Sequence, residues 1–568
     1  MRRILLALAV TLTPLALRAQ QPDTTPGRSL LPRDVERDAV RVYNAPGTTR
    51  AAGPYALDSG RVVTGDLAVL GGPVTVAGRV AGTLLVINGD AALASTARVD
   101  GDVVVVGGSV RGLNRGYVGG EIRIYRDRLR YTRTAQGIAI ADSSGAGEPW
   151  WRRFDPHRTR GESKFQVASA GAYNRVEGLA VDLGPRITRN FTGGSARLDA
   201  YAVVRTASSF RARGNDVGDN LHGEVRFGTD RGVLVGAGVY DLVAPVEAWG
   251  VSSLETGLAA ALFRRDYRDY FGRHGGGVQV GLFSGQQATF TLSYAAEHWT
   301  PRAAANAWTL FRSDAAWRPN PLMDDARLHL LNATLRLDTR TDELNPWSGW
   351  YLMADFEHGT GHLDSLGTTS VPRTYPAGRA ARYDRGFVDV RRYNRVSRDA
   401  QLNLRLVAGG WLDGDPLPLE RRLSADGYDA LPGFGFRQLA AGRDVASCAA
   451  SPAPAGMPAQ CDRIALAQAE YRSELHFRPF DWAGDDWVVP HFRADGTWVV
   501  FVDAGRGWRV GDPAPPMTYR AGALPALSTF RTDAGVGLDF DGFGVYVAKA
   551  LSAPGQPARA FIRLQHRF

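Results

Sequence analysis

One segment carries ionisable side chains at a spacing that suits a metal ion. Glu357 and His358 are followed by His362 and Asp364, and imidazole and carboxylate groups are ordinary zinc ligands. The segment lies at the end of a predicted strand, where a long glycine-containing loop begins. This position favours polar residues at a loop entrance over a metal site, so we expect neither a metal nor a cofactor.

No other segment carries a local catalytic motif. The sequence contains no Gly-x-Ser-x-Gly elbow, phosphate-binding loop or other hydrolase signature, so we predict that the protein is not an enzyme. A lipase or protease site assembled from residues distant in sequence is the alternative, and lipid hydrolysis by the purified protein would reveal it. The two cysteines, Cys448 and Cys461, share one Pro- and Ala-rich loop and are a plausible disulfide in an exported protein.

Length and composition bound the fold class. With 568 residues the chain is too long for one ordinary soluble domain, which leaves several units or one large barrel. The 66 glycines, the 10% aromatic content and the scarcity of helix-period runs favour an all-β chain. The net charge of +9 does not indicate a nucleic-acid partner, because the arginines are spread along the chain and lysine occurs only at Lys164 and Lys549.

The N-terminal segment predicts export. Residues 1–20 combine Arg2 and Arg3 at the start, the apolar run Ile4–Leu17 and a small residue, Ala19, as a secretory signal peptide does. The run is shorter than the roughly 20 residues that a spanning helix needs, and no later segment reaches that length. Export without a helical anchor leaves the periplasm, secretion or a β-barrel in the bacterial outer membrane.

Residues 21–162 divide into three predicted parts. Residues 21–60 lack periodicity and read as a flexible linker. In residues 61–124, Gly65–Gly72, Gly82–Gly89 and Gly101–Gly108 are three versions of one unit, spaced 17 and 19 residues apart. Such repeats predict a short β-solenoid, which resembles the polymer-forming domains of the bactofilin type; a periplasmic spacer is the other interpretation. Residues 125–162 read as an Arg- and Trp-rich linker.

Residues 163–568 predict an antiparallel transmembrane β-barrel of about sixteen strands. Apolar and polar side chains alternate, predicted strands run to roughly 10 residues, and short connections tend to alternate with long ones. The final segment, Ala560–Phe568, shows the same alternation. We expect it to be the barrel-closing strand, with Ile562, Leu564 and Phe568 on its apolar face.

A set of short motifs, in a fixed order, resembles the barrels of the Omp85 superfamily, also called bacterial surface antigen barrels. The motifs are Leu337–Arg340, Asn345–Leu352, Leu431–Arg437, Glu470–Arg472, Val500–Gly505, Ala534–Leu538, Val545–Lys549 and the terminal Phe568. The resemblance implies that a long extracellular loop folds back into the lumen. It also implies a weak seam between the first and last strands that can open sideways.

The same resemblance implies a contact between that loop and the barrel wall. The family's Arg-Gly-Phe/Tyr tip matches Gly433 and Phe434, but Pro432 stands where the arginine is expected. Arg437 is the nearest substitute, and a lumen arginine needs a carboxylate partner. We expect Glu470 and Asp503 to face inward and one of them to bind Arg437; an exposed loop arginine is the alternative.

The predicted role is insertion of proteins or lipids into the outer membrane, or their translocation across it. Members of the superfamily usually carry periplasmic POTRA domains before the barrel, whereas this chain shows no βααβ pattern there and has the solenoid instead. The expected partners are outer-membrane lipids and other outer-membrane or periplasmic proteins. A passive pore, or a scaffold anchored by the barrel, is the alternative from a different class.

Overall fold

The structure is a computed structural model of the chain. It describes residue 31 and residues 33–568 apart from 114–115, 126–127, 135–136, 141–159, 192, 209–215, 229–230, 286, 312–315, 342–345, 370–372, 374, 376, 398–399, 437–457, 476–495, 511–524 and 541–542. The predicted signal peptide lies outside the described residues. No helix in the described part of the chain is long and apolar enough to cross a membrane.

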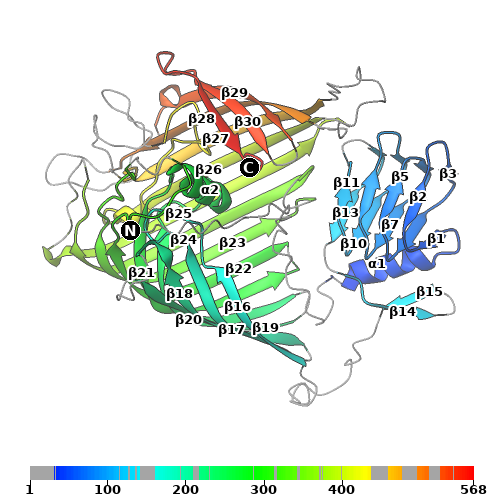
Figure 1. Cartoon of the computed structure of the whole chain (residues 1–568), viewed down its shortest axis with the longest axis horizontal. Helices are drawn as coiled ribbons and strands as arrows, with labels where there is room; N and C mark the ends of the chain where they lie inside the picture. Colours follow the sequence, from blue (N-terminus) through cyan, green and yellow to red (C-terminus); the bar gives the residue numbers. More distant parts are fainter. Residues whose placement is uncertain are drawn as a thin grey trace, which may run out of the picture.

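The N-terminal unit is a β-solenoid whose turns consist of three short strands each (Figure 1). Four turns are complete and β13 begins another. The first parallel sheet contains β1 (Thr49–Ala52), β4 (Leu67–Leu70), β7 (Leu84–Ile87), β10 (Val103–Val106) and β13 (Ile122–Tyr125). The second contains β2 (Tyr55–Leu57), β5 (Val74–Val76), β8 (Ala91–Leu93) and β11 (Val110–Arg111). The third contains β3 (Val62–Val63), β6 (Arg79–Val80), β9 (Arg98–Val99) and β12 (Tyr117–Val118).

Glycine columns explain the repeat seen in the sequence. Gly72, Gly89 and Gly108 stack in successive turns, and a Cβ atom on any of them would overlap the backbone of the turn before it. Beside such columns, aspartates bind the next turn: Asp66 Oδ1 accepts from Thr83 N at 2.7 Å, and Asp102 Oδ1 accepts from Glu121 N at 2.9 Å. The repeat therefore has two causes. Glycine is required where the backbones of successive turns approach closely, and aspartate is required where a backbone amide lies outside the strand pairings and needs an acceptor.

Two predicted linkers contain ordered structure. Within residues 21–60, α1 (Arg33–Asn44) packs Ala39 and Tyr43 against the outer side chains of β4 and β7. Within residues 125–162, β14 (Tyr131–Thr134) and β15 (Gly137–Ile140) form a hairpin, and Asn44 exchanges hydrogen bonds with the backbone of Ile138. Both linker predictions are therefore wrong for these residues, because an apolar helix face and a hairpin cover the solenoid.

The C-terminal unit is one antiparallel sheet of sixteen strands, each paired with its neighbours in the sequence. The strands are β16 (Arg160–Ser169), β17 (Ala180–Phe191), β18 (Gly194–Arg205), β19 (Val217–Phe227), β20 (Arg231–Pro245), β21 (Tyr270–Ser284), β22 (Ala288–Pro301), β23 (Asp325–Asp338), β24 (Gly349–Ser365), β25 (Ala380–Arg395), β26 (Ala400–Gly414), β27 (Arg463–Leu475), β28 (Gly496–Trp508), β29 (Arg531–Asp539), β30 (Gly544–Ala550) and β31 (Arg559–Arg563). The predicted all-β fold with a solenoid before a sheet of about sixteen strands is confirmed.

The remaining helices lie in the connections between these strands. The helix α2 (Ser253–Phe263) lies between β20 and β21. Short 3₁₀ turns occur at Thr206–Ser208, Ala377–Arg379, Leu419–Arg421 and Leu527–Thr529.

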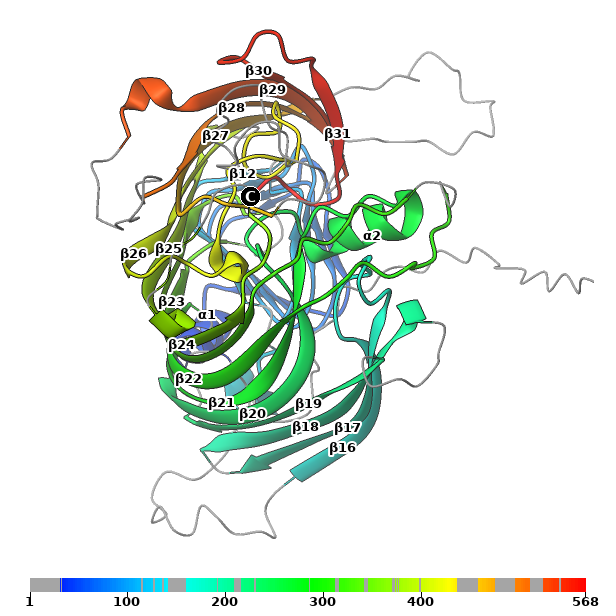
Figure 2. The same ribbon diagram turned by 90° about the vertical axis from the view of Figure 1, so that its left-hand side faces the viewer.

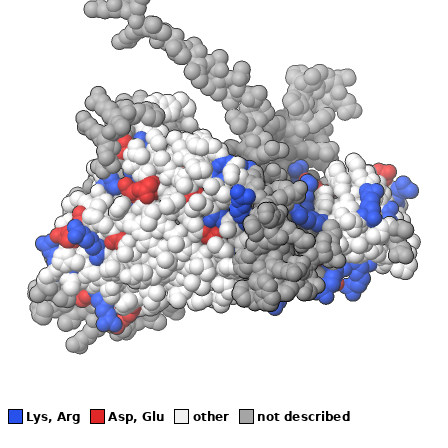
Figure 3. Space-filling view, turned by 90° about the horizontal axis from the view of Figure 1, so that it is seen from below, with Lys and Arg blue, Asp and Glu red and all other residues white. Residues whose placement is uncertain are grey.

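The sheet is curled, with an apolar outer face and charged residues inside. Alternate outward residues are exposed and apolar, among them Val278, Val280 and Leu282 of β21 and Phe290, Leu292 and Tyr294 of β22. Inward residues include many buried charged groups, and several of these pair with one another. In Figure 3 the visible face of the sheet is mostly uncharged, with scattered charged side chains. This arrangement is the reverse of that in a water-soluble barrel.

The solenoid contacts the end of the sheet that carries the connections β23–β24 and β25–β26. Trp347 packs against the edge of the solenoid core, and Arg395 donates a hydrogen bond to the Leu113 carbonyl at 3.2 Å. The Arg395 guanidinium also lies 5.7 Å from the centre of the Trp347 ring. The two units therefore meet through specific side chains.

The solenoid repeat gives the first prediction. We expect Gly89→Ala to lower the free energy of unfolding of the solenoid by about 3 kcal/mol or more, because the new methyl group would overlap the Gly72 backbone. Gly47→Ala is the matched control, since nothing lies within 4 Å of its Cβ position. Limited proteolysis of the purified full-length protein measures the effect. Equal protease resistance of the two variants would contradict the close-packed glycine column.

Candidate functional site

The long connection between β26 and β27, residues 415–462, enters the interior of the sheet. We call it the lumen loop; its described parts are 415–436 and 458–462. Leu417, Leu419 and Leu431 of this loop are fully buried. Arg421 Nε donates to Glu357 of β24 at 2.7 Å. The loop thus fills part of the lumen and is fixed to the wall by apolar packing and by ion pairs.

The tip of the lumen loop touches the wall at β29. The Gly433 amide donates to Asp533 Oδ2 at 2.5 Å, and a Cβ at Gly433 would lie 2.6 Å from the Ala550 nitrogen. Only glycine fits this approach. Phe434 is 2% exposed, and the Arg531 guanidinium lies 5.3 Å from its ring centre. The structure therefore places both predicted tip residues inside the sheet.

The C-terminal residues do not continue the last strand. β31 ends at Arg563, and the following five residues, Leu564–Phe568, form what we call the C-terminal tail. Ile562 is outward and 60% exposed, whereas Phe568 is 7% exposed. The prediction that Leu564 and Phe568 belong to the barrel-closing strand is wrong. The physical reason is that polar atoms of the tail form hydrogen bonds with side chains inside the sheet instead of with the backbone of another strand.

Arg567 of the tail binds the carboxylates that sequence reasoning assigned to Arg437. Its Nη2 donates to Asp503 Oδ2 at 2.5 Å, and its Nη1 lies 3.9 Å from Glu470 Oε2. Its guanidinium also lies 3.6 Å from the ring centre of Phe501. Glu470 and Asp503 are both buried and inward, and Arg437 lies outside the described residues.

The loop tip and the tail meet on adjacent strands. Asp503 of β28 lies directly opposite Asp533 of β29 in the strand register. Asp533 holds the amide of Gly433, and Asp503 holds Arg567. Two facing carboxylates inside the barrel therefore each accept a hydrogen bond from a different segment, which places the loop tip next to the tail.

A third contact joins the last strand, the lumen loop and α2. Arg563 Nε donates to Glu255 of α2 at 2.8 Å, and its Nη1 lies 2.6 Å from Asp429 of the lumen loop. Glu255 also accepts from the Leu564 amide at 2.7 Å. All three charged side chains are buried. We call this contact the Arg563 junction.

The sequence around Glu255 explains why it can serve two purposes. Ser252 caps α2: its Oγ accepts from the Glu255 amide and donates to Glu255 Oε2 at 3.0 Å. This Ser-x-x-Glu pattern is a capping box. It leaves Oε1 of Glu255 to receive Arg563 and Leu564. The sequence pattern indicates the helix cap, but it does not indicate that Glu255 also binds Arg563 and Leu564.

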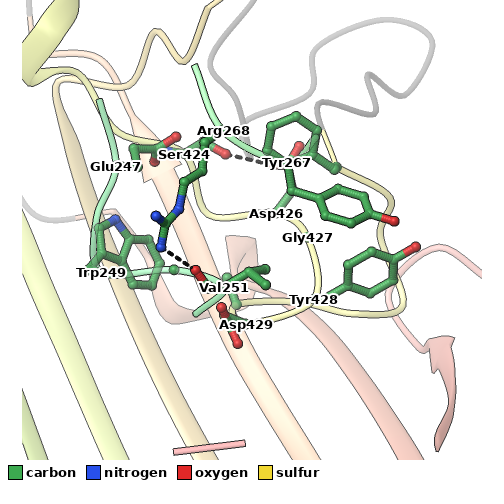
Figure 4. Close-up of a pocket in the computed structure, with 13 residues that line it drawn as sticks. Glu247, Trp249, Val251, Tyr267, Arg268, Ser424, Asp426, Gly427, Tyr428 and Asp429 are labelled. Atoms are coloured by element: carbon green, nitrogen blue, oxygen red, sulfur yellow. Dashed lines mark hydrogen bonds between the residues drawn. The ribbon is translucent and has the colours of Figure 1, made fainter. Parts of the chain in front are cut away.

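A small pocket lies next to the Arg563 junction (Figure 4). It is formed by the β20–β21 connection and the lumen loop, and Arg268 spans it to the Val251 carbonyl at 2.5 Å. Its lining is aromatic and acidic: Glu247, Trp249, Tyr267, Asp426, Tyr428, Asp429 and Phe436. The pocket marks where the two segments face each other.

The metal-like spacing at Glu357–Asp364 does not form one cluster. Glu357 is buried in the lumen and binds Arg421, whereas His358 bonds to Asp384 at 2.5 Å. On the outer side, Asp364 lies near His298 and Asp325, whose own contact is 2.8 Å. In the part of the chain that the structure describes, the side chains of His298, Asp325 and Asp364 lie close enough together to bind one metal ion. Arg327 already pairs with Asp364 at 3.2 Å.

The predicted disulfide involves one described residue. Cys461 is disulfide-bonded and fully buried in the lumen loop. The other cysteine of the chain, Cys448, lies outside the described residues. Cys461 also pairs through its backbone with Leu423 at 3.1 Å in both directions, so this end of the loop is fixed beside β27.

The tail contact gives the second prediction. We expect Arg567→Ala to lower the free energy of unfolding by about 3–5 kcal/mol, because Asp503 would remain buried without its partner. Arg327→Ala, which breaks an exposed pair on the outer face, should cost at most about 1 kcal/mol. Urea unfolding of both variants in lipid vesicles measures the difference. A loss no larger for Arg567→Ala than for Arg327→Ala would contradict the assigned contact.

Comparisons with known proteins find similarity at the level of the fold. No protein-family model matches the sequence, and no curated protein matches it. The structure is similar to that of BamA from Haemophilus ducreyi lacking POTRA domains 1–3, with 14% identity, coverage of 72% of this chain and 69% of that chain, and a TM-score of 0.40. It is also similar to CdiB from Acinetobacter baumannii (11% identity; 71% and 59% coverage; TM-score 0.29) and CdiB from Escherichia coli (11% identity; 71% and 62% coverage; TM-score 0.27).

Proposed function

We propose that the sixteen-stranded sheet spans the bacterial outer membrane and that the solenoid lies on its periplasmic side. The exposed apolar side chains of the outer face support a lipid environment. Strands β20 to β26 have 14 to 17 residues, more than the 9–11 residues, roughly, that a tilted strand needs to cross a bilayer. The predicted signal peptide supplies the route of export.

We propose that the protein inserts proteins or lipids into this membrane or moves them across it, in the manner of Omp85 barrels. The observation that carries the proposal is an open seam in the sheet. Among the described residues, no strand pairing joins β31 to β16, and the strands shorten from 13 residues in β28 to 9, 7 and 5 in β29, β30 and β31. Unpaired strand edges are unfavourable in lipid. A persistent seam therefore points to a function that uses it.

The filled lumen weighs against the alternative of a permanently open pore. The lumen loop and the C-terminal tail both occupy the interior, and their charged groups are buried in ion pairs with the wall. A passive channel requires a continuous water-filled path. An anchored scaffold is compatible with a filled lumen, and the docked solenoid is the feature that favours that second candidate.

Deletion of the gene from its native bacterium tests the proposal. We expect the amounts of other outer-membrane proteins to fall, as measured by quantitative proteomics of purified outer membranes, and complementation with the full-length chain to restore them. Unchanged membrane composition, together with steady ion conductance of the purified protein in planar bilayers, would contradict the proposal and support a passive pore.

A further inference from the structure

The helix α2 has its apolar side chains on the outside. Leu254, Leu258 and Phe263 are 43%, 37% and 45% exposed. The single charged residue of the helix, Glu255, is buried together with Thr256, Gly257 and Ala260. A surface helix of a water-soluble protein shows the opposite arrangement. The pattern on α2 matches that of the outer face of the barrel strands.

A neighbouring segment extends the exposed apolar surface. The amides of Leu310 and Phe311 donate to the carbonyls of Ala261 and Leu262, so these two residues pair with the last turn of the helix. Trp308, Leu310 and Phe311 are 67%, 52% and 51% exposed, and the Phe311 ring stacks on Phe263 at 5.7 Å. We call the resulting surface the seam patch; it consists of Leu254, Leu258, Phe263, Trp308, Leu310 and Phe311.

The seam patch lies in the opening between the two edge strands. At the β31 side, Glu255 binds Arg563 and the Leu564 amide. At the β16 side, Gly257 packs so closely on Ala172 and Tyr173 that a Cβ would lie 3.2 Å from the Tyr173 nitrogen. Figure 2 shows α2 between β31 and β16. The helix therefore occupies the place where strand pairing would otherwise close the wall.

Exposed apolar side chains also occur on both edge strands. Phe165 and Val167 of β16 are 75% and 67% exposed, and Ile562 of β31 is 60% exposed. Exposed apolar surface of this kind marks a contact with lipid or with another protein. The outer face of the barrel strands has the same apolar composition, which favours lipid as the occupant.

We propose that the seam patch contacts the acyl chains of the outer-membrane bilayer, so that α2 and residues 308–311 close the lateral wall in place of a β31–β16 strand pair. This inference rests on the proposed membrane location of the barrel. The charged side of α2 faces inward, where the Arg563 junction fastens it. Displacement of α2 would uncover the edge of β31 to lipid.

Fluorescence quenching by lipids with brominated acyl chains tests this contact. Leu258→Cys is labelled with bimane in the full-length protein, which is reconstituted in phosphatidylcholine vesicles with or without bromine on the acyl chains. Val280→Cys, on the outer face of β21, is the matched membrane control. Val62→Cys, an exposed residue of the solenoid, is the aqueous control.

The expected result is quenching by brominated lipid at positions 258 and 280 but not at 62, with iodide in the buffer quenching only position 62. Quenching at 280 together with iodide quenching at 258 would overturn the lipid contact of the seam patch alone. Absence of lipid quenching at both 258 and 280 would overturn the proposed membrane location as well. The controls therefore separate the two failures.

Discussion

A buried arginine between two carboxylates from distant parts of the chain is the interaction on which the C-terminal half of the barrel depends. Arg563 cannot be buried without partners, because an unpaired guanidinium in this environment would be strongly destabilising. Glu255 comes from a helix 308 residues earlier in the chain, and Asp429 comes from the lumen loop. Each of these segments is therefore held in place by the other two.

This arrangement explains how the barrel can contain a seam and still be stable. The short strands β29, β30 and β31 provide few pairings at one edge. The neighbouring lumen side chains compensate: Asp533 holds the tip of the lumen loop, and Asp503 holds the C-terminal tail. The inside of the seam is thus polar and tightly bonded, while its outside, α2 and Trp308–Phe311, is apolar. Opening such a seam requires rearrangement of ion pairs and one helix, and leaves the fourteen strands between β16 and β31 paired as they are.

Local patterns in the sequence predict most of the secondary-structure elements, but they do not predict the long-range contacts between these elements. Alternation identified Ile562 as outward, and the Gly65, Gly82 and Gly101 spacing identified the solenoid, because both depend on near neighbours. The bend after Arg563 depends on Asp503 and Glu255, which no local pattern connects to the tail. The sequence pattern does not predict helix α1, although Val35, Ala39 and Tyr43 have helical spacing, because half of its residues are charged. The helix α2 was missed because it is apolar on its exposed side and shows no amphipathic period.

The most direct test of the central claim is the distance between α2 and β31 when the Arg563 junction is broken. Spin labels at Leu258→Cys and Ile562→Cys, both exposed on the outer side, report this distance by double electron–electron resonance in lipid vesicles. Arg563→Gln breaks the junction, and Arg327→Gln on the outer face is the control. We predict a narrow distance distribution in the unaltered background and the control, and a broader and longer one in Arg563→Gln. An identical narrow distribution in all three proteins would contradict the account.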